Sequence, residues 1–253
     1  MRAAARVAAA LSILALAASC ATAKKGKTPA ETLLTQRMGQ VLLRDGHPVD
    51  AEKAFRDALK DDPKNPEVLD GLGVSLVMQG RYQDALPFLQ KAVQLSPQNG
   101  SYRNNLGVAQ MELGQYKEAE LAFTAADASP NSDDRISAAI NRGRLAQRQG
   151  DLAGAEREFT LAMARDPKSF AATFGRGVAR ENRGDLEGAA EDYLAALKLQ
   201  PSSAEGNLRL GLCLVSLQKG DLGRRYLQRA IDLDPNGETG TKARMLIQQS
   251  KTP

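Results

Sequence analysis

Six glycines recur at a nearly constant spacing, and this register constrains the fold more than any other feature of the chain. The steps between them are 34, 34, 36, 34 and 34 residues. A glycine inside a helix costs roughly 0.5–1 kcal/mol relative to alanine. Six of them in register therefore indicate that two helices approach closely once in every unit. The glycines are Gly39, Gly73, Gly107, Gly143, Gly177 and Gly211.

Three further rows of residues keep the same register. The first alanine row is Ala51, Ala85, Ala119, Ala155 and Ala189, with Gly223 in the sixth place. A row of bulky side chains follows at Phe55, Leu89, Phe123, Phe159, Tyr193 and Leu227. The second alanine row is Ala58, Ala92, Ala126, Ala162, Ala196 and Ala230. The alanines predict a closely packed second helix in each unit, and the bulky row is expected to fill the space between neighbouring units.

Helix ends are also marked in each unit. A second glycine is expected to end the first helix in a left-handed cap. These glycines are Gly46, Gly80, Gly114, Gly150, Gly184 and Gly220. A proline follows the second helix of each unit. Because the residue before a proline avoids the helical region, we expect the second helix to end there. The longer third step places extra residues at 131–134, which we expect to form a polar loop between units.

This order of small, bulky and proline positions over 34 residues resembles the tetratricopeptide repeat across about residues 32–235. The resemblance implies an all-α fold, a right-handed superhelical solenoid of six tetratricopeptide-like helix pairs with a C-terminal capping helix. The expected units are 32–65, 66–99, 100–135, 136–169, 170–203 and 204–235. A capping helix and tail are expected at residues 236–253.

The first 19 residues have the pattern of an export signal: two arginines, a short apolar stretch and small residues before Cys20. The ending Leu16-Ala17-Ala18-Ser19-Cys20 resembles the lipobox of bacterial lipoproteins. That resemblance implies cleavage before Cys20, a diacylglycerol on its sulfur and an N-acyl lipid. It also implies an outer-membrane lipoprotein facing the periplasm, because Ala21 replaces the aspartate that retains lipoproteins in the inner membrane. Residues 20–31 are the expected lipidated cysteine and flexible tether. The alternative is an ordinary secretory signal with a chance cysteine.

Composition excludes several classes of function. Without Arg2 and Arg6 of the signal segment, 32 basic residues face 30 acidic ones, so nothing indicates nucleic-acid binding. One histidine and two cysteines are too few for a zinc site or a disulfide scaffold. His47 is expected in a solvated turn, and Cys213, among leucines, as a buried and inert thiol. We find no catalytic constellation, so the sequence predicts neither an enzyme, nor a metal site, nor a cofactor apart from the lipid.

A solenoid of this family binds partners through its concave wall, which the first helix of each unit lines. Positions one and four residues after each glycine are expected to face that groove. In the first three units they form an apolar strip, interrupted in the fourth unit by Arg144, Gln147 and Arg148. The candidate groove residues are Leu43, Val74, Val77, Met78, Val108 and Met111. An exposed apolar strip is typical of a partner site. The alternative is that these side chains pack between neighbouring helices.

A lipidated array of six such repeats resembles the pilotins of type IV pilus secretins, the PilF, PilW and Tgl kind, and most of all the Tgl-like members. The resemblance implies a protein, monomeric when free, that binds secretin subunits and promotes their assembly in the outer membrane for pilus biogenesis and motility. Two other binding functions remain open. One is an adaptor for cell-wall hydrolases or outer-membrane barrel assembly, and the other is a lipoprotein of tight-adherence pili.

Overall fold

The computed structural model describes residues 28–249, and the regular secondary structure in this range is entirely helical. Cys20 and the predicted export signal lie outside the described residues. The helices are α2 (Pro29–Arg44), α3 (Pro48–Asp61), α4 (Pro66–Met78), α5 (Tyr82–Leu95), α6 (Gly100–Glu112), α7 (Tyr116–Asp127), α8 (Ser132–Gln149), α9 (Leu152–Arg165), α10 (Phe170–Asn182), α11 (Leu186–Leu199), α12 (Ala204–Ser216), α13 (Gly220–Leu233) and α14 (Glu238–Gln249).

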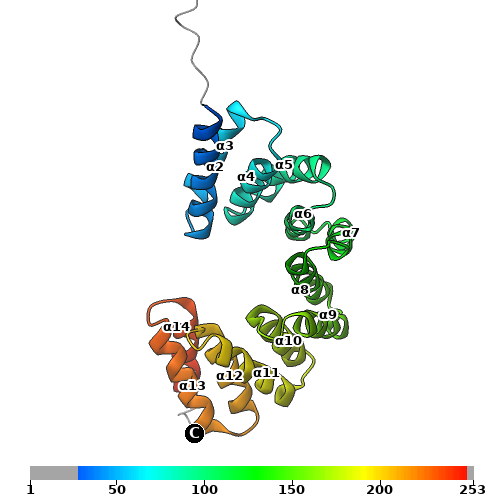
Figure 1. The fold of residues 1–253 in the computed structure, drawn as a ribbon. Coiled ribbons are helices and arrows are strands. Elements are labelled where there is room, and N and C mark those ends of the chain that lie inside the picture. Colours follow the sequence, from blue (N-terminus) through cyan, green and yellow to red (C-terminus); the bar gives the residue numbers. More distant parts are fainter. Residues whose placement is uncertain (1–27, 250–253) are drawn as a thin grey trace, which may run out of the picture.

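Six helix pairs stack side by side into an arc, as the sequence predicts. Each pair packs against the next, and α2, α4, α6, α8 and α10 lie on the inner side of the arc (Figure 1). The second helices α3, α5, α7, α9 and α11 form the outer side. The fold is thus a solenoid whose concave side is built from the first helix of each repeat.

The glycine register marks the crossing of the two helices in each pair, and that prediction is confirmed. A Cβ added at Gly107 would lie 2.5 Å from the Phe123 ring, and one added at Gly143 would lie 2.9 Å from the Phe159 ring. Both phenylalanines are buried. The bulky row therefore packs first on the glycine of its own repeat. It also reaches the neighbouring repeat, because the Phe159 ring lies 2.5 Å from the Cβ position of Gly175.

Five of the six expected left-handed glycine caps are present, at Gly46, Gly80, Gly114, Gly150 and Gly184. The prediction for Gly220 is wrong, because Gly220 is the first residue of α13. The left-handed residue of the sixth repeat is Gln218, with φ 59°. Gln218 lies 34 residues after Gly184, so the turn keeps its register although the glycine has moved two residues along the chain.

The polar loop predicted at residues 131–134 is also wrong beyond its first residue. Asn131 caps α8 by accepting a hydrogen bond from the Asp133 N–H at 2.9 Å, and the helix begins at Ser132. Asp134 is buried in the first turn, where it accepts hydrogen bonds from the hydroxyls of Ser101 and Ser129 at 2.6 and 2.7 Å. Polar residues here serve helix capping rather than a loop, which is the usual role of asparagine and aspartate at N-termini.

The two ends of the arc differ. At the C-terminal end α14 covers the last repeat, where Ala243, Leu246 and Ile247 pack with Leu208 and Leu227, as a capping helix is expected to do. At the N-terminal end, α2 is the first helix that the structure describes.

The start of α2 corrects the predicted tether. Thr28 and Glu31 form a capping box, in which the Thr28 N–H donates to the Glu31 carboxylate at 2.6 Å. The segment 29–31, predicted to be flexible, is therefore the first turn of α2. Within residues 28–249 no helix is both long and apolar enough to cross a membrane.

Candidate protein-binding groove

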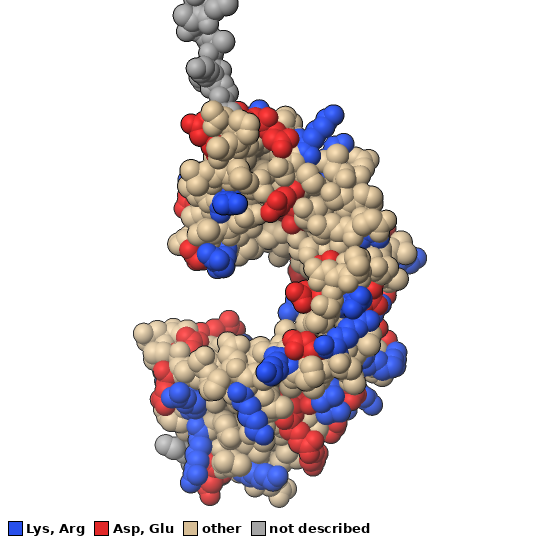
Figure 2. Space-filling view, viewed as in Figure 1, with Lys and Arg blue, Asp and Glu red and all other residues tan. Residues whose placement is uncertain are grey.

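Three hollows follow one another along the inner helices of the arc, and together we call them the groove. The first is lined by α2, α4 and α6, the second by α6, α8 and α10, and the third by the C-terminal halves of the same three helices. Figure 2 shows the concave opening that these helices surround. The groove thus arises from the stacking of first helices, which the glycine crossings hold in place.

The first hollow, of about 620 Å³, combines apolar and acidic side chains. Leu43 and Val74 line it together with Glu67, Asp70 and Tyr102. The Asp70 carboxylate accepts two hydrogen bonds from the Asn105 amide, at 2.9 and 3.0 Å.

Two ionisable groups of the first hollow have shifted pKa values. Burial raises the pKa of Asp70 to about 6, against the opposing effect of the Asn105 hydrogen bond. Burial also raises the pKa of Tyr102 to about 12, with a contribution from the nearby Asp70 carboxylate. The hollow can therefore offer a carboxylate and a protonated phenol to a basic side chain flanked by apolar groups.

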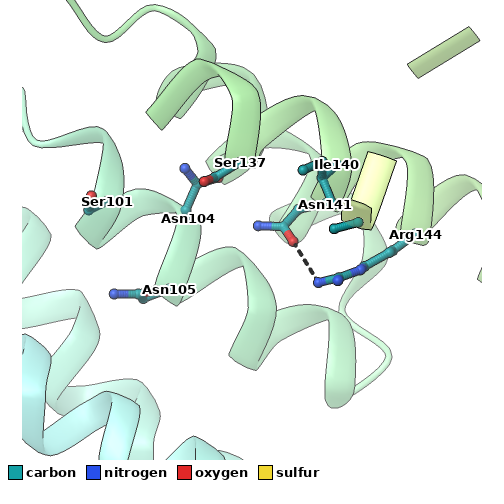
Figure 3. A pocket seen from close by; sticks show the side chains of 8 residues that line it. Ser101, Asn104, Asn105, Ser137, Ile140, Asn141 and Arg144 are labelled. Atoms are coloured by element: carbon teal, nitrogen blue, oxygen red, sulfur yellow. Dashed lines mark hydrogen bonds between the residues drawn. The ribbon is translucent and has the colours of Figure 1, made fainter. Parts of the chain in front are cut away.

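The second hollow, of about 330 Å³, is polar. Asn104, Asn105, Asn141 and Arg144 line it from α6 and α8, with the hydroxyls of two serines nearby (Figure 3). Asn104 is buried, and its amide donates to the Asp134 carbonyl at 2.9 Å. Among the described residues, none donates a hydrogen bond to the Asn104 Oδ1. Side-chain amides in such a row can pair with the backbone amides of an extended segment.

The third hollow, of about 460 Å³, is apolar and basic. Val108, Met111 and Val178 line it with Arg144 and Arg148. Glu112 also lines this hollow and pairs with the Arg148 guanidinium at 2.6 Å, so Arg144 supplies the excess positive charge of the hollow. The groove therefore changes along its length, from apolar and acidic through polar to apolar and basic.

The structure distributes the predicted groove residues over two hollows. Leu43 and Val74 line the first hollow, whereas Val108 and Met111 line the third.

Two of the remaining predicted residues lie at the border between groove and core. Met111 is only 4% exposed and Val77 is half-buried, and both pack with core clusters. Met78, half exposed at the end of α4, lines none of the three hollows. Packing between helices, the alternative left open above, therefore describes Met111 and Val77 in the free protein.

Sequence reasoning missed the acidic side of the groove. Asp70 lies on the apolar helix α4, beyond the first turn that holds Glu67, where a carboxylate is out of place unless it has a partner or a task. That isolation was the available signal. Tyr102 and Asn105 carried no comparable signal, because their approach to Asp70 depends on the packing of α6 on α4.

The other chemically capable residues lie apart from the groove. His47 is exposed in the turn before α3, and Cys213 is buried in α12, where burial raises the pKa of its thiol to about 11. Both placements agree with the predictions. Within residues 28–249 no cluster of three or more histidine, cysteine, aspartate or glutamate side chains is arranged to hold a metal ion.

Several solved structures have a similar fold. PilW, a widely conserved type IV pilus biogenesis factor, superposes with a TM-score of 0.74 at 19% identity, over 85% of this chain and 99% of PilW. The pilF protein of Pseudomonas aeruginosa gives 0.70 at 18% identity, over 87% and 97%. A chain of the Cut9–Hcn1 complex of the APC/C superposes with a TM-score of 0.73 at 18% identity. The superposition covers 84% of this chain but only 42% of that chain.

At these identities the structural likeness establishes the fold alone. A search among curated protein sequences finds no match. The chain does match the tetratricopeptide repeat family, at residues 37–100, 140–204 and 184–238 by one description of the repeat and at 76–143 by another. These matches cover more than half of the chain, and the glycine crossings and helix pairs agree with them, so this protein belongs to the tetratricopeptide repeat family.

Proposed function

We propose that the protein is an outer-membrane lipoprotein, anchored through acylated Cys20, that binds secretin subunits in its groove and promotes their assembly for type IV pilus biogenesis. It binds proteins and catalyses no reaction. The single observation that carries the proposal is the groove with two apolar ends, on a chain whose N-terminal sequence resembles a lipoprotein signal. The likeness to PilW and pilF over nearly their full lengths adds support, although it concerns the fold.

The groove favours an extended partner segment with a definite direction. An apolar side chain fits beside Leu43 and Val74 at one end and beside Val108 and Met111 at the other. A basic side chain complements Asp70, and an acidic one complements Arg144 at the far end. Between them the asparagines of the second hollow pair with backbone. Charges placed in this way select the orientation of a partner more than they raise its affinity.

A secretin subunit is a plausible occupant on physical grounds. Its membrane-destined surface is apolar and its strand edges are unpaired until it inserts, which makes it prone to aggregate in water. A lipid-anchored groove that holds such a surface next to the membrane shortens the time for which it is exposed. An adaptor for cell-wall hydrolases would share the groove but would have no need of an apolar partner surface.

The double substitution Val74→Glu/Val108→Glu tests the proposal, because it places one charge in each apolar hollow. Both valines are half-buried, so helicity and melting temperature are expected to change little. In the complex each carboxylate would be desolvated against an apolar partner, which costs several kcal/mol. We expect pull-down of the secretin to fail and secretin to persist as monomers, measured in cells that hold the variant at normal abundance.

The matched control is Leu121→Glu/Leu161→Glu, which adds the same charges to exposed leucines on the outer helices α7 and α9. It should retain pull-down and secretin assembly. A folded Val74→Glu/Val108→Glu protein that still assembles secretin would remove the groove from the proposal. Loss of the fold would instead show that both valines belong to the core. If the Cys20→Ala variant stayed in the outer membrane and kept its acyl label, the proposed anchoring through Cys20 would be wrong.

A further inference from the structure

The N-terminal face of the first repeat is apolar, and within residues 28–249 it has no preceding repeat to cover it. On α2, Leu34 is 68% and Met38 is 57% exposed. One repeat later, the residues at the same register are Val68 and Leu72, and both are fully buried against α3. The exposed face of α2 therefore has the apolar composition that later repeats use to contact the repeat before them, but here no repeat precedes it among the described residues. We call Leu34, Met38, Val41 and Leu42, with the adjoining surface of α3, the end face.

A hollow of about 730 Å³ marks the place on the end face where a preceding helix would pack. Met38 and Leu42 line it from α2, and Ala54 lines it from α3. Four charged residues of α3 rim it as two ion pairs: the Lys53 Nζ lies 3.0 Å from Asp50, and the Lys60 Nζ lies 3.3 Å from Asp57. The rim is thus neutral overall, while the centre of the end face is apolar.

The opposite end of the solenoid shows what such a face requires. There α14 packs its apolar side on the last repeat and presents a polar surface to solvent. A solenoid end without a polar cap exposes apolar surface to water. The end face of α2 is therefore expected to have a cover that is not part of residues 28–249.

The sequence before α2 indicates what that cover is. Cys20 precedes Thr28 by eight residues, which limits the distance between them to roughly 26–29 Å when fully extended. A flexible chain of this length spans on average only about 16 Å. Residues 21–27 are polar and include three lysines, so they are a poor cover for an apolar face themselves but suit a surface of anionic headgroups.

We propose that the end face docks on the lipid surface, so that α2 lies against the bilayer to which Cys20 is anchored. This inference rests on the acylation of Cys20 proposed above. An anchored chain keeps the bilayer permanently within reach of the end face, whereas a second copy of the protein is nearby only at high local concentration. An apolar helix face beside basic residues is the pattern of interfacial membrane helices. Docking also places the first hollow, which α2 helps to line, next to the lipid surface.

Depth measurements on the lipidated protein test the docking. A single cysteine is introduced by Leu34→Cys or, as a matched control, by Leu121→Cys, whose leucine is equally exposed at 70% but lies on the outer helix α7. Each is labelled with an environment-sensitive fluorophore. The native Cys213 does not compete, because it is buried. The proteins are reconstituted in vesicles of phosphatidylethanolamine and phosphatidylglycerol that contain nitroxide-labelled lipid.

We expect nitroxide lipid to quench the probe at position 34 at least threefold more than the probe at position 121, with a blue-shifted emission at position 34 only. A probe placed by Val41→Cys should be quenched in the same way. That quenching should fall to the level at position 121 when Leu34→Asp/Met38→Asp is added, while flotation with the vesicles stays unchanged.

Three results would overturn the inference. Equal quenching at positions 34 and 121 in a protein that floats with the vesicles refutes docking and leaves the anchor intact. A protein that does not float refutes the anchor and, with it, the docking. A blue shift at position 34 that appears in detergent without bilayers and grows with protein concentration shows that a second copy covers the end face.

Discussion

The second and fifth repeats differ in chemistry at the same register positions of their first helices. In α4, Leu72 and Leu76 are fully buried in a hydrocarbon core. Three repeats later these positions hold Arg176 and Arg180, and both guanidinium groups contact Asp192 of α11. Both repeats nevertheless pair a first helix of 13 residues with a second helix of 14 residues.

The ion pairs of the fifth repeat form a connected network. The Arg176 guanidinium makes two hydrogen bonds to Asp192, at 2.9 and 2.6 Å. Arg180 bonds Asp192 at 3.1 Å and Glu156 of α9 at 2.9 Å. Asp192 is only 3% exposed. Figure 2 shows charged side chains of both signs intermixed over the lower part of the arc.

The comparison teaches which part of the repeat is fixed and which is free. Every repeat keeps the glycine and the bulky residue where its two helices cross, because no larger side chain fits there. The positions beside this crossing, which contact the second helix of the same repeat and the repeat before it, hold either hydrocarbon or paired charges. Replacing a buried ion pair by apolar residues is often neutral, whereas removing one partner is costly.

The largest expected effect concerns the fixed part, and it should be equal in both regions. Gly107→Leu and Gly143→Leu each drive a side chain into a buried phenylalanine, Phe123 or Phe159, at a helix crossing. We expect each to lower the unfolding free energy by about 3 kcal/mol or more, measured by urea denaturation. Gln90→Leu, on the exposed side of α5, is the control and should change it by less than about 0.5 kcal/mol. A loss that small at either glycine would show that its repeat has no close crossing.

The sequence predicted this fixed part because its signal is local and repeated. Small residues at a period of 34 can be recognised without knowing which helices touch. The contacts that were missed depend on two helices at once: Asp70 with Asn105 of α6, and Arg176 with Asp192 of α11. Of these four residues only Asp70 stands out in the sequence, through its place on an apolar helix, and the other three resemble ordinary solvated residues.

The predicted helix ends failed where one rule competed with another. At Gln218 the register of the turn outweighed the preference of the left-handed conformation for glycine. Residues 132–134 are polar and were predicted to form a loop, but Asn131 caps the N-terminus of α8 and these residues form its first turn. The groove residues were found only in part, because the sequence shows which helix lines the concave side but not which side chains the neighbouring repeat covers.

A double-mutant cycle should separate the two kinds of contact layer. Asp192→Ala alone leaves two partly buried guanidinium groups without their shared partner, and we expect it to lower the unfolding free energy by about 3 kcal/mol. Arg176→Leu/Asp192→Ala recreates the pair that the third repeat has at Leu106 and Ala122. It should recover to within about 1 kcal/mol of the wild type, because Arg180 keeps Glu156.

The hydrocarbon layer of the second repeat provides the contrast. Leu72→Ala should lower the unfolding free energy by about 2–5 kcal/mol, because it leaves a cavity in the core. Unlike the loss at Asp192, this loss should not be recovered by replacing a charged residue. Additive effects of Arg176→Leu and Asp192→Ala would mean that the two residues act independently, and the comparison between the repeats would then lose its basis.

The smallest expected effect uses pH, and it contrasts a carboxylate of the groove with one of the network. Burial raises the pKa of Asp70 from 3.8 to about 6, so the folded protein holds this proton more tightly than the unfolded chain does. The protonated Asp70 carboxyl group therefore stabilises the folded protein below pH 3.8, and this stabilisation is lost as the pH rises through 6. Asp70→Asn should therefore raise the unfolding free energy by about 1 kcal/mol at pH 7 and leave it nearly unchanged at pH 4.

The pKa of Glu156 is shifted in the opposite direction. The hydrogen bond from Arg180 is the main cause that lowers its pKa below 4.5, so its contribution is present at neutral pH and is lost as the pH falls through the lowered value. Glu156→Gln should thus destabilise the protein at pH 7 and matter less in acid, measured by the same urea titrations. If Asp70→Asn also destabilised the protein at pH 7, its carboxylate would be a structural partner of Asn105. A stabilising effect joined to weaker secretin binding would instead show that the groove keeps a buried charge for its partner at the expense of the fold.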